Sequence, residues 1–214
     1  MFCRTLFIPF LIATFVVATS AQDVGHWNFN IGGGVGFPQS STGDFANAGG
    51  HFVVGAGPNF GPLLGISGEF MWHDLPIKRE VINLIGVPDA SARQYSVTVN
   101  GILRLPLKGR LGAYVIGGGG WYRRSGELTA PTFVAGTVCP GFWVWWGSCV
   151  NGLFPADAVL ASSTSDAFGG NIGGGLTYQI GGGNIKFYTE VRYHHAAHDK
   201  VDTDLLPLTF GFRW

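Results

Sequence analysis

The sequence predicts an all-β fold, an eight-stranded antiparallel transmembrane up-and-down β-barrel with long extracellular loops. Three observations support this prediction. Apolar side chains occupy every second position in eight separate segments, which is the period of a β-strand with one apolar face. Glycine supplies 35 of the 214 residues, about twice its usual share, whereas charged residues, at 12%, reach about half of theirs. Mean hydropathy is positive, yet most of the chain has no apolar segment of helix-spanning length, and barrel strands need only about 9–11 residues.

The N-terminus has the layout of a secretory signal peptide. Arg4 precedes an apolar run at residues 6–18, and small residues lead to Ala21. The run is shorter than the roughly 20 residues of a spanning helix, which disfavours an N-terminal anchor. We therefore expect a signal peptide at residues 1–21 and a β-barrel domain at residues 22–214.

The eight expected strands are separated by turn residues. They cover residues 27–37, 50–58, 64–73, 95–105, 111–123, 168–180, 185–194 and 206–214. In the first strand, Trp27 and Phe29 share a face that would meet lipid, while Asn28 and Asn30 share the face that would line the barrel.

The second to fifth strands repeat this pattern. The outward face is marked by Phe52 in the second, Phe70 in the third and Val97 in the fourth. The fifth strand is less regular, because the glycine run at residues 117–120 obscures its alternation. We still expect a strand there, since a tight turn precedes it.

The last three strands alternate more clearly. Ile172 marks the outward face of the sixth strand and Val191 that of the seventh, and the two are joined by a glycine-rich turn at residues 181–184. In the eighth, Phe210 and Phe212 alternate with smaller residues up to the aromatic terminus.

The links between the expected strands alternate between short and long. Short links lie near residues 59–62, 106–110 and 181–184, and long ones near residues 38–49, 74–92, 124–166 and 195–204. Outer-membrane barrels keep short turns on the inner side and long loops on the outer side. Aromatic residues also fall close to the strand ends, as in a membrane girdle, which a β-sandwich or a lipocalin-type barrel would not need.

The segment from Leu206 to Trp214 resembles the terminal strand of bacterial outer-membrane barrels, in which an aromatic last residue serves as the assembly signal. With the strand pattern and the stretch from Lys186 to His195, it makes the chain similar to the small outer-membrane β-barrel domain family that includes the OmpA and OmpX barrels. The resemblance implies export through the periplasm into the outer membrane and contact with its lipid. It also implies recognition by the barrel-assembly machinery through the C-terminal strand.

Charged and imidazole side chains fall on inward positions of the expected strands. They are Glu69, Arg104, Lys186, Glu190, Arg192 and His194. Opposite charges in a narrow interior are expected to pair into a network, and in the small barrels that the chain resembles such a network plugs the lumen. An eight-stranded barrel is only wide enough for its own side chains, which argues against a porin. A gated pore or proton path is the alternative.

A second cluster combines His194, His195 and His198 with Asp199. These residue types bind metals or act as general bases. Successive strand residues point to opposite faces, however, so His194 and His195 cannot reach one metal from a regular strand. The position is similar to that of lipid A deacylases, which carry a nearby serine, but here alanines follow the histidines. We expect no catalytic site, metal or cofactor.

The longest link contains two cysteines, Cys139 and Cys149. In an oxidising compartment they are expected to form a disulfide, with metal binding as the weaker option. The loop that they close carries four aromatic residues: Phe142, Trp143, Trp145 and Trp146. Exposed apolar groups of this kind indicate contact with a partner, a ligand or lipid. Alternatively, the tip folds over the barrel mouth or extends the sheet.

Two function classes remain open. The first is a non-enzymatic barrel whose surface loops serve adhesion, binding or envelope integrity, with a surface ligand or a host or other cell as partner. The second is a narrow conduit for small molecules or a lipid-modifying enzyme. The net charge of zero gives no indication of a nucleic-acid partner. The sequence favours the first class.

Overall fold

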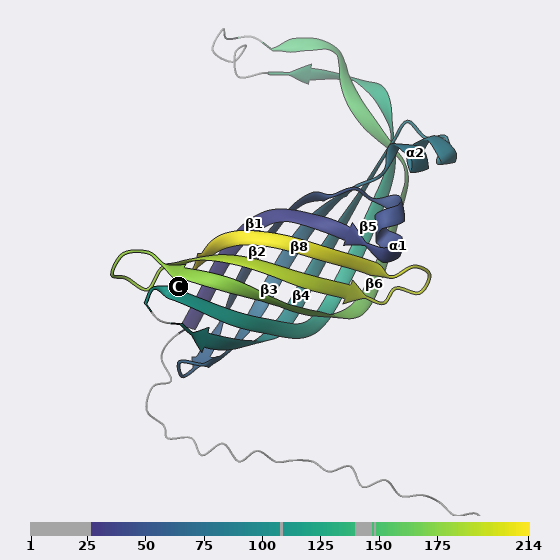
Figure 1. Cartoon of the computed structure of the whole chain (residues 1–214). Helices are drawn as coiled ribbons and strands as arrows, with labels where there is room; N and C mark the ends of the chain where they lie inside the picture. Colours follow the sequence, from purple (N-terminus) through teal and green to yellow (C-terminus); the bar gives the residue numbers. More distant parts are fainter. Residues whose placement is uncertain (1–26, 108, 140–146, 148) are drawn as a thin grey trace, which may run out of the picture.

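The computed structural model describes residues 27–107, 109–139, 147 and 149–214, and these form one closed barrel in which each strand pairs with its sequence neighbours (Figure 1). The strands are β1 (Trp27–Gln39), β2 (Gly49–Phe60), β3 (Leu64–Pro76), β4 (Asp89–Pro106), β5 (Leu111–Val138), β6 (Val150–Gln179), β7 (Lys186–Ala196) and β8 (Thr203–Arg213). The eight predicted strands and the fold class are confirmed. The expected signal peptide, residues 1–21, lies outside the described residues.

The barrel closes through pairing of β1 with β8, from Asn30 opposite Arg213 to Gln39 opposite Asp204. Backbone hydrogen bonds between Phe29 and Trp214, 3.0 and 3.1 Å long, continue this seam. No edge of the barrel wall is left unpaired along the seam, which is why a closed sheet can satisfy its backbone groups in lipid.

The two faces of the wall differ as the alternation predicts. Outward positions carry exposed apolar side chains, such as Ile31, Val99 and Ile172. Inward positions are buried and largely polar, with smaller apolar clusters among them. One cluster joins Ile102, Ile116 and two tyrosines, Tyr114 and Tyr188. The apolar surface thus faces outward and the packed, mixed interior fills the lumen.

Inward glycines leave the space that the large lumen side chains occupy. A Cβ atom at Gly175 would lie 2.6 Å from Cζ of Tyr114, and one at Gly211 would lie 2.8 Å from Cε1 of Tyr188. Real Cβ contacts are essentially never that short, so a larger residue at either position would displace a ring and the backbone of the neighbouring strand. The high glycine content therefore reflects packing inside the barrel as well as turns.

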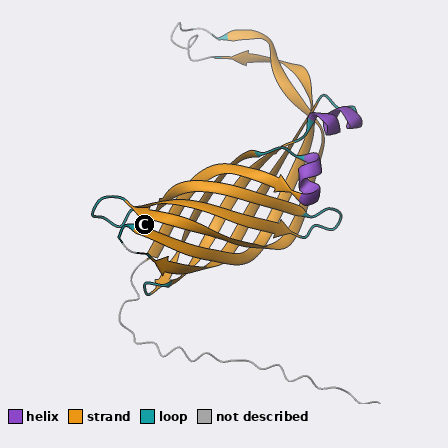
Figure 2. Cartoon of the chain, in the orientation of Figure 1, coloured by secondary structure: helices purple, strands orange, loops and turns teal. Residues whose placement is uncertain are grey.

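The long links are more ordered than the sequence predicted. Two short helices follow β1 and β3, α1 (Ser40–Phe45) and α2 (Arg79–Ile85), as Figure 2 shows. We expected a long loop at residues 124–166, and this expectation is wrong. Strands β5 and β6 continue through most of the segment as a paired ribbon. Strand alternation is lost there because neither face of the ribbon is restricted to lipid. No helix within the described residues is long and apolar enough to cross a membrane.

Candidate functional site

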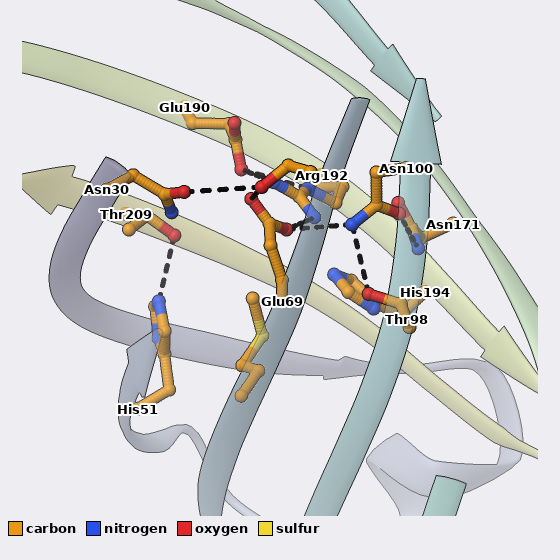
Figure 3. Close-up of polar contacts among 12 residues, drawn as sticks. Asn30, His51, Glu69, Thr98, Asn100, Asn171, Glu190, Arg192, His194 and Thr209 are labelled. Carbon is orange, nitrogen blue, oxygen red and sulfur yellow. Dashed lines mark hydrogen bonds and ion pairs between the residues drawn. The ribbon is translucent and has the colours of Figure 1, made fainter. Parts of the chain in front are cut away.

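The centre of the lumen holds a buried ion-pair cluster. Arg192 on β7 donates from Nη1 to Oε2 of Glu69 on β3 at 2.5 Å, and from Nη2 to Oε1 of Glu190 at 2.5 Å. Its Nε also donates to Oε1 of Glu190 at 2.9 Å. All three side chains are buried, and Figure 3 shows them pointing toward one another. One guanidinium thus joins two carboxylates inside the barrel.

Neutral donors add hydrogen bonds to both carboxylates. Asn100 Nδ2 donates to Oε2 of Glu69 at 2.9 Å, and Asn171 donates in turn to Oδ1 of Asn100 at 2.9 Å (Figure 3). On the other side, the Tyr114 hydroxyl donates to Oε2 of Glu190 at 2.7 Å. Together these bonds connect β3, β4, β5, β6 and β7 across the lumen.

Of the residues expected in this network, His194 takes no part in these bonds and contacts Tyr122 instead, and two cations lie elsewhere. Arg104 donates to the carbonyl oxygen of Leu64 at 3.3 Å and to Oδ1 of Asn59 near the short-turn end. Lys186 lines a cavity of about 210 Å³ at the same end. Neither forms an ion pair with any residue that the structure describes. The reason is distance, because Lys186 is four residues, or about 13 Å, from Glu190 along the strand.

Arg213 was missing from the expected network, although its inward position was evident from the alternation of β8. Its Nη2 lies 4.0 Å from Oε2 of Glu190. The guanidinium carbon lies 4.4 Å from the ring centre of Tyr114 and 5.1 Å from that of Tyr188. It is the second cation near the central carboxylates.

The histidines separate into an inward and an outward group. His194 faces the lumen, with Nδ1 3.1 Å from the Tyr122 hydroxyl, and its ring centre lies 6.4 Å from that of His73. His51, which sequence reasoning missed, packs on His73 at 4.8 Å. His195 points outward and pairs with Asp204 at 2.7 Å. The described residues contain no group of three histidine, cysteine or acidic side chains that could hold a metal ion.

His198 lies in the link after β7, and its Nδ1 is 2.9 Å from the hydroxyl of Ser165 on β6. Burial lowers the pKa of His198, and the charge of Arg124 lowers it further. Within the described part of the chain, Nε2 of His198 has no hydrogen-bond partner. The pair therefore lacks the orienting carboxylate of a catalytic triad.

At the long-loop end, β5 and β6 extend beyond the barrel as a two-stranded ribbon. Pairing of β4 with β5 stops at Thr129, and pairing of β6 with β7 starts at Gly169. We call residues 130–158 the arm; within it the strands pair only with each other, from Ala130 opposite Ala158 onward. A register shift between Leu128 and Thr129 marks its base, and Figure 1 shows the arm projecting past α2. Such bulges bend strands locally.

A disulfide joins Cys139 and Cys149 at the far end of the arm, where their Cα atoms are 4.4 Å apart. The expected disulfide is present, and the two strands that lead to it pair with each other up to Val138 and Val150. The four aromatic residues that the disulfide encloses, Phe142, Trp143, Trp145 and Trp146, lie outside the described residues.

Comparison with known proteins agrees with this architecture. Residues 10–213 match the family described as the outer membrane protein beta-barrel domain. No protein with a curated description matches the chain by sequence.

Among solved structures, Neisserial surface protein A is similar at a TM-score of 0.60 and 14% identity, covering 90% of this chain and 98% of that one. A major outer membrane protein from Thermus thermophilus is similar at 0.52 and 10% identity, covering 89% and 99%. The chain belongs to the outer membrane protein beta-barrel domain family and is an integral protein of the bacterial outer membrane.

Proposed function

We propose that this protein is a non-enzymatic outer-membrane barrel whose arm binds an apolar surface of a partner outside the cell. The observation that carries the proposal is the arm itself. Phe133 and Leu153 are 68% and 69% exposed on it, and Asp157 is the single charged residue in the sequence between 130 and 158. Contiguous apolar surface on a solvent-exposed element usually marks an interaction site.

The side-chain faces of the arm, and not its strand edges, are the proposed contact surface. Pro131 lies opposite Asp157, and Pro155 lies opposite Phe133. Proline has no backbone N–H to donate to an added strand, so it protects a free edge against pairing. The enclosed aromatic residues Phe142, Trp143, Trp145 and Trp146 are proposed to enlarge the apolar surface at the tip, and the disulfide to fix the tip.

The lumen supports a binding role over a conduit. The Arg192 cluster bridges five of the eight strands through bonds of 2.5 to 2.9 Å. A small barrel filled by its own side chains leaves no continuous path for solutes. An enzymatic role finds little support, since His194 and His195 diverge and the Ser165–His198 pair lacks a carboxylate.

The proposal also includes the route to the membrane. Residues 1–21 are proposed to direct export, and the outward stripe of β8, which includes Phe210 and Phe212, to contact lipid and the barrel-assembly machinery. Both aromatic side chains are exposed on the outer wall of the barrel.

Changing the arm surface is expected to reduce adhesion. In cells that display the protein, Leu153→Asp or Trp143→Ala is expected to lower retention on alkyl-coated glass several-fold, because an apolar contact is lost or opposed by a buried charge. The measurement is the fraction of cells that remain after a standard wash.

The matched control is Leu84→Asp, an 87% exposed apolar residue on α2 and outside the arm, which is expected to leave retention unchanged. Equal retention of the Leu153 variant and the parent would contradict the proposal. The purified protein is also expected to show no steady conductance in a planar bilayer; a defined open channel would support the conduit instead.

A further inference from the structure

A continuous apolar groove lies at the extracellular mouth of the barrel, at the base of the arm. It consists of two adjoining chambers of about 360 and 350 Å³. Both chambers are lined by Phe45 at the end of α1, Ile77 before α2, and Ala92 on β4. Each chamber is in the size range of small-molecule sites. We call the two together the mouth groove.

The mouth groove continues the inner wall of the barrel and opens to the aqueous side. Its floor includes Arg124 and Gly126 on β5, which share the face of Tyr122, a fully buried lumen residue. The helix side contributes Val81 and Ile85 of α2. Because the lipid-facing side chains of β5 point the other way, a ligand reaches this groove from outside the cell and not from the bilayer.

The charges on the groove differ between its two chambers. Arg124 lines the first chamber, and its Nη1 donates to the carbonyl of Val201 at 3.3 Å and to Oγ1 of Thr203 at 3.0 Å. No carboxylate in the described part of the chain pairs with it. The second chamber is almost wholly apolar and has Glu127 in its lining. An anionic group is therefore attracted to the first chamber, and the second chamber suits an apolar chain.

We propose that the mouth groove binds a free long-chain carboxylate from the aqueous phase, with its head group on Arg124 and its chain along Phe45, Ile77 and Val81. An arginine that retains unused N–H donors beside an apolar wall suits a carboxylate, which accepts two parallel hydrogen bonds from a guanidinium. The aliphatic chain removes apolar surface from water on both sides. This site is separate from the apolar surface of the arm.

The test uses the full barrel in lipid nanodiscs and cis-parinaric acid, a fluorescent carboxylate, as the probe. Arg124→Gln is expected to weaken binding by about tenfold or more, because a charge-assisted pair is lost. Arg123→Gln is the matched control. Arg123 is the next residue, faces outward and pairs with Asp166 at 2.7 Å, so its variant is expected to bind as the parent does.

Three further measurements separate the proposal from its rivals. The alcohol with the same aliphatic chain is expected to bind the parent and the Arg124 variant equally. Val81→Asp places a charge where the aliphatic chain would lie, and it is expected to abolish binding of the acid. Increasing the anionic lipid of the nanodisc is expected to leave the affinity unchanged. The proposal would be overturned if the acid bound the parent and Arg124→Gln with equal affinity, or if membrane lipid alone displaced the acid.

Discussion

Replacing Arg192 by methionine is expected to destabilise the barrel by about 3–5 kcal/mol, the usual cost of removing one partner from a buried ion pair. The substitution leaves Glu69 and Glu190 buried without the guanidinium that lies 2.5 Å from each. Arg213, at 4.0 Å from Glu190, compensates only in part. The measurement is the urea midpoint in lipid vesicles, followed by tryptophan fluorescence.

Two variants test the physical reason for this loss. Adding Glu69→Gln and Glu190→Gln to Arg192→Met removes the three charges that the guanidinium of Arg192 joins. Arg213 then loses its carboxylate at 4.0 Å, so we expect the triple variant to recover part of the lost stability. Arg123→Met breaks an exposed ion pair on the outer surface and is expected to have little effect. An unchanged midpoint for Arg192→Met would contradict the assignment of this cluster as a buried structural pair.

Replacing Gly118 by alanine is expected to destabilise the barrel by about 1–3 kcal/mol, as overpacking of a filled interior does. The added Cβ would clash first with the backbone carbonyl oxygen of Val99, and it would lie 2.6 Å from Oδ1 and 2.7 Å from Cα of Asn100 on the neighbouring strand. Asn100 is the residue that donates to Glu69, so the substitution also disturbs the ion-pair cluster. The same urea titration measures the effect.

The control for Gly118 is Gly101→Ala. Gly101 is an outward residue of β4, and a Cβ atom there would meet nothing nearer than 3.8 Å. We expect its midpoint to match that of the parent. If both alanine variants behaved alike, glycine at position 118 would not be explained by the packing of the lumen.

The architecture could be predicted because lipid imposes a strict period on the wall. Residues such as Trp27 and Asn28 alternate along β1 since one faces lipid and the other faces the lumen. The alternation imposed by lipid ends where the barrel wall ends. Phe133 and Val134 are neighbours on the arm and both are exposed, so no period distinguishes the ribbon from a loop.

The lumen cluster could be predicted in part for a similar reason. The alternation along each strand identified Glu69, Glu190 and Arg192 as inward-facing. Alternation does not say, however, where along the barrel axis a residue lies. Arg104 and Lys186 also occupy inward positions of their strands, yet they lie at the short-turn end. The contact of Ser165 with His198 spans 33 residues, and it depends on how the strands align, which alternation within single strands does not specify.

Deleting the arm tests the central claim most directly. Joining Thr129 to Val159, which lie opposite each other in the register, through an Asn-Gly turn removes residues 130–158 and keeps the barrel wall. Retention on alkyl-coated glass is then compared between cells that display the parent, cells that display the shortened chain and cells without the protein. We predict that the shortened chain reaches the outer membrane folded and that retention falls to the level of cells without it. Retention equal to the parent's would contradict the claim that the arm binds.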